Sequence, residues 1–184
     1  RNASLYYLGR IAFQQQKYED AANIFENLLQ NDRDNIILLK AAAFSNLKAQ
    51  KLEKAEGFYS KIIALVPDSK DSIYGYALVL YGIQKYQDSY QILKNAKADS
   101  GDDRDALLLL ARTEFKLGYP EALDHFSKWL EKGDDPLVLK EFAETAEQQS
   151  LYSRAIEAYK KIKQSNRSED AGLQKGEIDF LIGR

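Results

Sequence analysis

The sequence predicts an all-α protein: a solenoid of antiparallel helix pairs with about 11 helices. Three observations lead to this fold class. The 184 residues contain only ten glycines and three prolines, too few for an all-β chain that turns about every 8–12 residues. Equivalent residues recur at steps of 34, 34, 33 and 33. Within each repeat, the apolar residues follow the spacing of one helical face.

Four sets of equivalent residues carry the repeat, and each set has the same four steps. They are Tyr18, Leu52, Tyr86, Tyr119 and Tyr152; Ala21, Ala55, Ser89, Ala122 and Ala155; Phe25, Tyr59, Leu93, Phe126 and Tyr159; and Leu28, Ile62, Ala96, Trp129 and Ile162. The first set, aromatic in four of five repeats, is expected to open the second helix of each pair. The small residue three positions later allows the first helix to approach closely.

The first helices are recognised by a large or medium residue followed by a small one. These dipeptides are Leu8-Gly9, Ala42-Ala43, Tyr76-Ala77, Leu110-Ala111 and Phe142-Ala143. Short polar turns follow, which favours antiparallel neighbours. Two first helices also carry a start signal, because Asp102-Asp103 and Asp134-Asp135-Pro136 place capping carboxylates before an apolar run.

At these residues the sequence resembles the tetratricopeptide repeat family, whose pattern is W-x2-L-G-x2-Y, then A-x3-F, then P. The first repeat matches with Leu5, Leu8-Gly9, Ala12, Ala21 and Phe25, and the second repeat ends with Pro67. We expect one solenoid domain with repeats at 2–35, 36–69, 70–103, 104–135 and 136–169, followed by an extra helix at 170–184. The resemblance implies a right-handed superhelix whose concave groove is lined by the first helices.

Composition and motifs argue against an enzyme. There is no cysteine and one histidine. His125 falls in a set otherwise made of Ile24, Phe58, Ile92 and Ala158, which predicts a half-buried packing residue. The acidic loop at 100–105 lacks the ligand spacing of a calcium loop and fits helix capping better. We therefore predict no catalytic residue, no cofactor and no metal.

The predicted binding site is the groove formed by the first helices, a surface that suits an extended or helical peptide. Its expected floor is aromatic and aliphatic, with basic residues for orientation. The predicted peptide-binding residues are Tyr6, Arg10, Phe13, Lys40, Phe44, Lys48, Tyr74, Leu78, Tyr81, Arg112, Phe115 and Lys116. Packing between neighbouring first helices is the alternative interpretation of Phe44, Leu78 and Phe115.

The predicted function is therefore a non-enzymatic scaffold that binds a protein or peptide partner. A structural spacer or oligomerisation module remains an alternative, so a homo-oligomer is possible. A helical-repeat RNA binder is disfavoured by the net charge of −2 and the pI near 5.6, and we expect no nucleic-acid partner. The sequence contains no run of about 18 apolar residues, so we predict no membrane insertion. The compartment stays open between cytoplasm and bacterial envelope. The absence of Met at position 1 and the apolar last segment together predict a natural chain that is longer at both ends.

Overall fold

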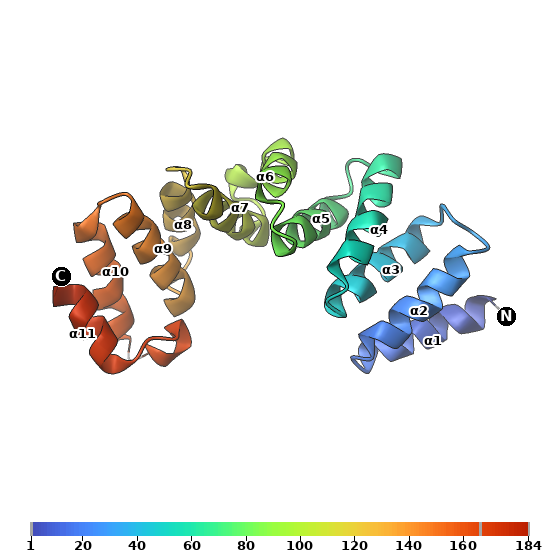
Figure 1. The fold of residues 1–184 in the computed structure, drawn as a ribbon, viewed down its shortest axis with the longest axis horizontal. Helices are drawn as coiled ribbons and strands as arrows, with labels where there is room; N and C mark the ends of the chain where they lie inside the picture. The colour runs from blue at the N-terminus through green and yellow to red at the C-terminus, as the bar shows by residue number, and fades with distance from the viewer. Residues whose placement is uncertain (1, 166, 184) are drawn as a thin grey trace. The chain divides into compact units, whose positions relative to one another are not determined.

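The computed structural model describes residues 2–165 and 167–183, and within them it contains eleven α-helices and two short 3-10 helices. Consecutive helices pack in pairs, as Figure 1 shows for the two helices of each repeat. The predicted all-α architecture of sequential helix pairs is confirmed.

The chain divides into two compact units, Arg1–Ala96 and Lys97–Arg184. The first unit contains α1 (Asn2–Gln14), α2 (Tyr18–Leu29), α3 (Ile36–Lys48), α4 (Leu52–Leu65), α5 (Lys70–Gly82) and α6 (Tyr86–Asn95). The second contains η1 (Ala98–Ser100), α7 (Arg104–Leu117), α8 (Ala122–Leu130), α9 (Pro136–Gln148), α10 (Tyr152–Gln164), η2 (Glu169–Ala171) and α11 (Lys175–Gly183). That all residues form one solenoid domain stays a prediction.

The small residue of each second helix lies fully inside its helix pair. Ala21, Ala55, Ser89 and Ala122 have no exposed surface, so the paired backbones approach closely at this position. Ser89 is the polar exception. Its hydroxyl donates to the carbonyl of Ala77 at 2.9 Å, which satisfies the buried oxygen within the same pair.

The large residue four positions later fills the core, and in the first two repeats it requires a glycine opposite. A methyl group on Gly75 would lie 2.5 Å from the ring of Tyr59, and one on Gly9 would lie 2.7 Å from the ring of Phe25. Tyr59 is 4% exposed, and its burial raises the pKa of its phenol to about 12. Both aromatic rings therefore occupy space that only a residue without a side chain leaves open.

The turn inside each pair repeats one hydrogen-bond pattern five times. One residue adopts a left-handed conformation, with φ between 59° and 72°; it is Gln16, Gln50, Gln84, Gly118 or Ser150. Its N–H donates three residues back and the next N–H donates five residues back, as from Gln50 to Leu47 at 3.1 Å and from Lys51 to Asn46 at 2.9 Å. This pair of bonds is the Schellman motif, which satisfies the last carbonyls of the first helix.

The predicted acidic caps are present. The Asp103 carboxylate accepts from the N–H groups of Asp105 and Ala106 at 3.0 Å. Asp135 accepts in the same way from Leu137 at 3.0 Å and Val138 at 3.1 Å. Asp103 and Asp135 thus occupy the donors that α7 and α9 leave unpaired at their first turns.

Two expected boundaries are wrong. Tyr119 does not open its helix, because α8 begins at Ala122. Pro120 has no N–H, and Ala122, Leu123 and Asp124 donate three residues back, at 3.1–3.4 Å, as in a 3-10 turn.

The helix expected over 170–184 is the second difference. The helix α11 begins only at Lys175, and Gly172, which was expected inside a helical segment, has φ 65° and ends the preceding turn. Ala171 and Leu173 are nevertheless buried, so this segment packs into the second unit without being an α-helix.

Candidate functional site

In the first unit, nine predicted residues share one face of the first helices, which we name the α1–α3–α5 face. Each lies at one of four equivalent positions, 34 residues apart in successive helices. The face consists of Tyr6, Arg10, Phe13, Lys40, Phe44, Lys48, Tyr74, Leu78 and Tyr81.

Aromatic contacts join the α1 and α3 parts of this face. Phe13 of α1 stacks on Phe44 of α3, with 5.2 Å between ring centroids and 28° between planes. The ammonium of Lys48 lies 5.4 Å from the Phe44 ring centroid, within range of a cation–π interaction. Phe44 still exposes 44% of its surface, so it offers an apolar contact to a ligand.

The other aromatics of the face are half-buried and contribute to both packing and surface. Tyr6 packs on Phe25 at 5.9 Å between centroids, and Phe13 packs on Tyr18 at 5.1 Å. Tyr81 contacts Tyr86 edge to face at 5.3 Å. These contacts fix the ring orientations, so the floor of the face is formed before any ligand binds.

Two cations of the face are available. Arg10 is exposed and Lys40 is half-buried, and the described residues provide neither with a carboxylate partner. Unpaired cations beside exposed aromatic surface can bind carboxylates together with apolar side chains.

Arg112 in the second unit differs, because a neighbouring carboxylate already holds it. Its Nε donates to both oxygens of Glu141 on α9, at 2.9 and 3.0 Å. Burial raises the pKa of Glu141 above its usual value, although Arg112 acts in the opposite direction. The positive charge at Arg112 is therefore largely matched within the second unit.

The remaining two predicted residues accompany Arg112 on α7. Phe115 is half-buried and packs on a core that includes Ala111, Phe126 and Val138. Lys116 is exposed, with its ammonium 5.6 Å from the Phe115 ring centroid. These residues form an aromatic and cationic surface of the same kind as Phe44 and Lys48.

The sequence analysis missed a buried polar pair between α7 and α8. Nδ1 of His125 lies 2.6 Å from Oε2 of Glu114, and the two side chains are 15% and 1% exposed. His125 is half-buried as predicted. The signal for Glu114 was present, because the equivalent positions hold the uncharged residues Ala12, Asn46, Leu80 and Ala146 and an acid there needs a partner.

Neither a metal site nor a membrane span is found in the part of the chain that the structure describes. It contains no group of three or more metal-binding side chains, and none of its helices is long and apolar enough to cross a bilayer. In the acidic loop at 100–105, Asp103 caps α7 and Asp102 contacts the hydroxyl of Ser100 at 3.1 Å.

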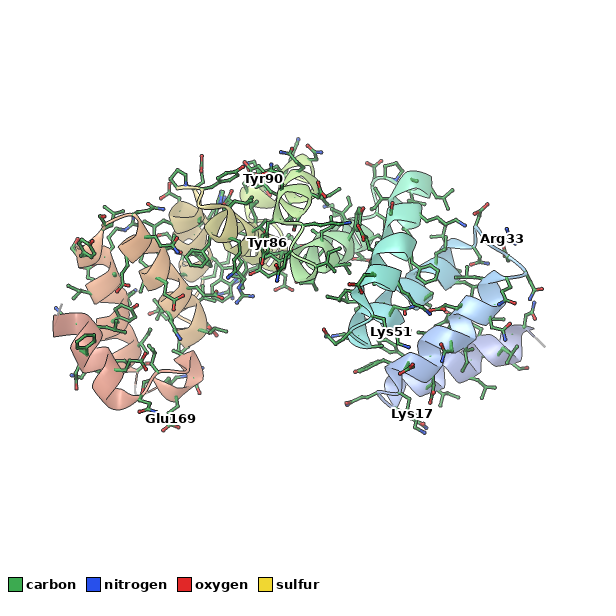
Figure 2. All side chains as sticks on the ribbon, in the orientation of Figure 1. Lys17, Arg33, Lys51, Tyr86, Tyr90 and Glu169 are labelled. Carbon is green, nitrogen blue, oxygen red and sulfur yellow. The ribbon has the colours of Figure 1, made fainter. Side chains whose placement is uncertain are left out.

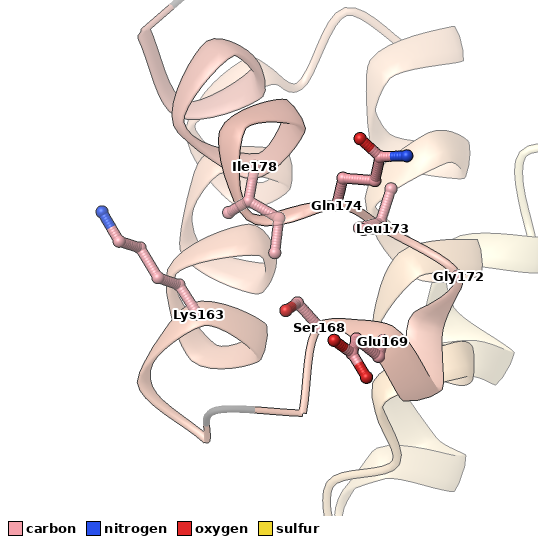
Figure 3. Close-up of a pocket in the computed structure, with 7 residues that line it drawn as sticks. All are labelled: Lys163, Ser168, Glu169, Gly172, Leu173, Gln174 and Ile178. Atoms are coloured by element: carbon pink, nitrogen blue, oxygen red, sulfur yellow. The ribbon is translucent and has the colours of Figure 1, made fainter.

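A cavity of about 800 Å³ lies beside η2 and α11. Figure 3 shows its lining, with Lys163 on α10, Ser168 and Glu169 at the 3-10 turn, and Ile178 on α11. Lys163 pairs with Asp179 at 2.5 Å. The polar residues that line the cavity are exposed or half-buried. The cavity therefore lacks the buried polar groups that orient a small ligand.

The helix pairs, the left-handed turns and the 34-residue spacing define a helical-repeat protein. A family model described as tetratricopeptide repeat matches residues 12–78, and one described as anaphase-promoting complex, cyclosome, subunit 3 matches residues 48–129. The chain thus contains tetratricopeptide repeats, matched by that family's model over residues 12–78.

Solved structures with low sequence identity share the fold. MamA from Desulfovibrio magneticus RS-1 is 17% identical, with a TM-score of 0.83 over 92% of this chain and 98% of its own. A tetratricopeptide repeat protein from Parabacteroides merdae is 21% identical, with a TM-score of 0.71 over 99% and 83%. YrrB, described as having an unusual peptide-binding site, is 17% identical, with a TM-score of 0.76 over 91% and 88%.

Proposed function

We propose that the chain is a protein-interaction scaffold whose α1–α3–α5 face binds a peptide with carboxylate and large apolar side chains. The observation that carries this proposal is the exposed Phe44 ring with Lys48 beside it and the unpaired cations Arg10 and Lys40 on the same face. The presence of tetratricopeptide repeats supports a scaffold in general.

The chemistry of the face explains why a peptide fits it better than a small molecule. Rings held by packing provide contact area at low entropic cost, because their rotamers are already fixed. The cations orient a ligand through charge-assisted hydrogen bonds to carboxylates. A peptide-binding site described for YrrB is consistent with this proposal.

In the second unit, we propose Arg112, Phe115 and Lys116 as the equivalent contact residues. Phe115 and Lys116 resemble Phe44 and Lys48 in chemistry, with an ammonium 5.6 Å from the ring centroid against 5.4 Å. Arg112 contributes by exchanging Glu141 for a carboxylate of the ligand. Because that exchange replaces an existing pair, Arg112 adds less affinity than Arg10 or Lys40.

Selection from a displayed peptide library tests this function with the chain as it stands. We expect enrichment of peptides that combine Asp or Glu with aromatic or aliphatic residues. Phe44→Ala should weaken the binding of the selected peptides about tenfold, which is the usual effect of truncating an anchoring residue.

The matched control is Leu65→Ala on α4, since Leu65 is 45% exposed and Phe44 is 44% exposed. Binding should be unchanged in this variant. Selected peptides that bind the Phe44→Ala and Leu65→Ala variants equally well would rule out the α1–α3–α5 face.

A further inference from the structure

In the fourth repeat, an arginine stacks on a tryptophan where another repeat has two aliphatic residues. Arg104 and Trp129 occupy the positions of Ile36 and Ile62 in the second repeat. The guanidinium carbon of Arg104 lies 3.8 Å from the centroid of the Trp129 ring, within the range of a cation–π interaction. A charged group needs hydrogen-bond partners that an aliphatic residue does not need. The fourth repeat therefore has a hydrogen-bonding requirement at a position where the second repeat has none.

This stacked pair lines a cavity of about 250 Å³ at the start of α7 and the end of α8. Three of the lining residues are cations, Arg104, Lys128 and Lys132, and two are acids, Asp102 and Glu131. The lining thus has an excess of positive charge, although the net charge of the whole chain is −2. The cavity is smaller than the sites of drug-sized ligands, which measure roughly 300–1,000 Å³, so it suits a small anionic group.

Lys128 crosses the loop before α7 and keeps one N–H group for a further acceptor. Its ammonium donates to the carbonyls of Asp99 and Ser100, at 2.8 Å in both cases. Gly101 leaves room for this crossing, because a methyl group on Gly101 would lie 2.7 Å from Cε of Lys128. An ammonium has three N–H groups, so the two bonds to the loop leave one for a ligand.

The structure gives the three cations of the cavity no carboxylate partner among the residues that it describes. Arg104 and Lys132 each approach one backbone carbonyl, at 3.5 Å. Asp102 and Glu131 line the same cavity, but they are exposed and pair with none of the three cations. The positive charge of the cavity is therefore not matched within the second unit.

Two buried N–H groups of the lining residues are also without an acceptor. They are Nε of Arg104 and Nε1 of Trp129, which have no hydrogen-bond partner in the described part of the chain. Buried N–H groups nearly always have a partner, and here both belong to residues that line one cavity. An anion bound in the cavity would bring the acceptors that these residues lack.

We infer that this cavity, which we name the α7–α8 pocket, binds a phosphate group through Arg104, Lys128 and Lys132. A guanidinium can donate to two oxygens at once, and each ammonium acts as a further point charge. The tetrahedral phosphate group offers oxygens in several directions to three cations, whereas a planar carboxylate offers only the two that one guanidinium can hold. The phosphate is either inorganic or attached to a side chain of a peptide, and both would use these contacts.

The fluorescence of Trp129 tests the inference, because Trp129 is the only tryptophan of the chain and lines the pocket. Sodium phosphate is titrated into the whole 184-residue chain at constant ionic strength, which keeps the screening of surface charges unchanged. We expect a saturable change with a dissociation constant below about 1 mM, and isothermal titration calorimetry should give the same value. Sodium acetate should bind about tenfold more weakly or not at all.

Two variants identify the groups that hold the phosphate, and calorimetry measures both. Arg104→Gln should weaken phosphate binding about tenfold or more, because it removes the bidentate donor. Lys132→Gln should weaken phosphate binding about threefold, because Lys132 is exposed and its charge is screened. Circular dichroism checks the fold, and exposed Lys132 can be replaced without disturbing the core.

The matched control is Lys17→Gln in the first unit, where Figure 2 labels the lysine. Lys17 is exposed like Lys132 but does not line the pocket. The control removes the same charge from the chain and should leave the affinity for phosphate unchanged.

A five-residue peptide with a central phosphoserine, compared with its unphosphorylated form, distinguishes the two sources of phosphate. Tighter binding of the phosphopeptide than of inorganic phosphate would assign the pocket to a phosphorylated peptide, and the reverse order to free phosphate; either result supports the inference. Calorimetry that detects no binding of phosphate or phosphopeptide would overturn the inference. Equal affinity for acetate, or equal weakening by Lys132→Gln and Lys17→Gln, would overturn it as well.

Discussion

At the scale of single residues, the same position of the repeat carries different chemistry in different repeats. The position of Glu114 is apolar in three repeats and holds Asn46 in the fourth, and that of His125 is apolar in the other four. The pair of changes places a hydrogen bond of 2.6 Å between α7 and α8. A buried carboxyl group is acceptable only with such a partner, because it has lost its hydration.

His125→Ile should therefore be more damaging than its partial burial suggests. The variant leaves Glu114 buried without its partner, which should lower the free energy of unfolding by about 2–4 kcal/mol. Adding Glu114→Leu should recover most of the loss, because it completes the apolar combination of Leu80 and Ile92. Urea denaturation of both single variants and the double variant measures the coupling.

An additive result, with the double variant the least stable of the three, would contradict a coupled pair. It would mean that each side chain is held by its own surroundings.

At the scale of the element, the five left-handed turns set how each helix pair closes. Four of them place a residue other than glycine at φ near 60°, where a side chain crowds the backbone. The repeated hydrogen bonds and the packing of the helices hold these residues in place. Gly118 alone occupies the position without strain.

Gln84→Gly should raise the free energy of unfolding by about 0.5 kcal/mol, since the relief of strain exceeds the entropic cost of glycine. Gly118→Ala should lower the free energy of unfolding by about 1 kcal/mol. The added methyl group would have no atom within 4 Å, so the loss would come from the backbone conformation alone. Thermal or urea denaturation measures both.

Gln91→Gly is the matched control for the turn. Gln91 is exposed within α6, so the same substitution should cost about 1 kcal/mol there. Destabilisation by glycine at both positions would show that the turn stores no strain.

At the scale of the molecule, each of the two units contains a hydrophobic core. One cluster of buried residues extends from Ala21 to Val79 in the first unit, and another from Leu123 to Ile178 in the second. Repeat proteins are stabilised mainly by contacts between neighbouring repeats, so each unit holds most of what it needs to fold.

We expect the fragments 2–96 and 97–183 to fold separately. Their helical circular dichroism signals should add up to that of the intact chain, and each should unfold cooperatively with urea. The control is a cut between Ala49 and Gln50, which separates Ala42 and Ala43 from Ala55 and Tyr59 in one core and should abolish most helicity. An unfolded 2–96 fragment would contradict the division into two units.

The sequence alone determined the helix pairs, because their packing depends on local spacing that recurs every 34 residues. Ala21 and Ala55 are buried, and Asp103 and Asp135 cap their helices, as predicted. The groove residues could be assigned to the first helices for the same reason. Their role in binding stays a prediction.

Only the tertiary structure decided which side chains meet. Arg112 and Glu141 are 29 residues apart and Glu114 and His125 are 11 apart, and no periodicity predicts a partner at those distances. The start of α8 depends on how residues 119–124 share their hydrogen bonds after Pro120. Periodicity places a side chain on a helical face, but what packs against that face decides whether the side chain is buried.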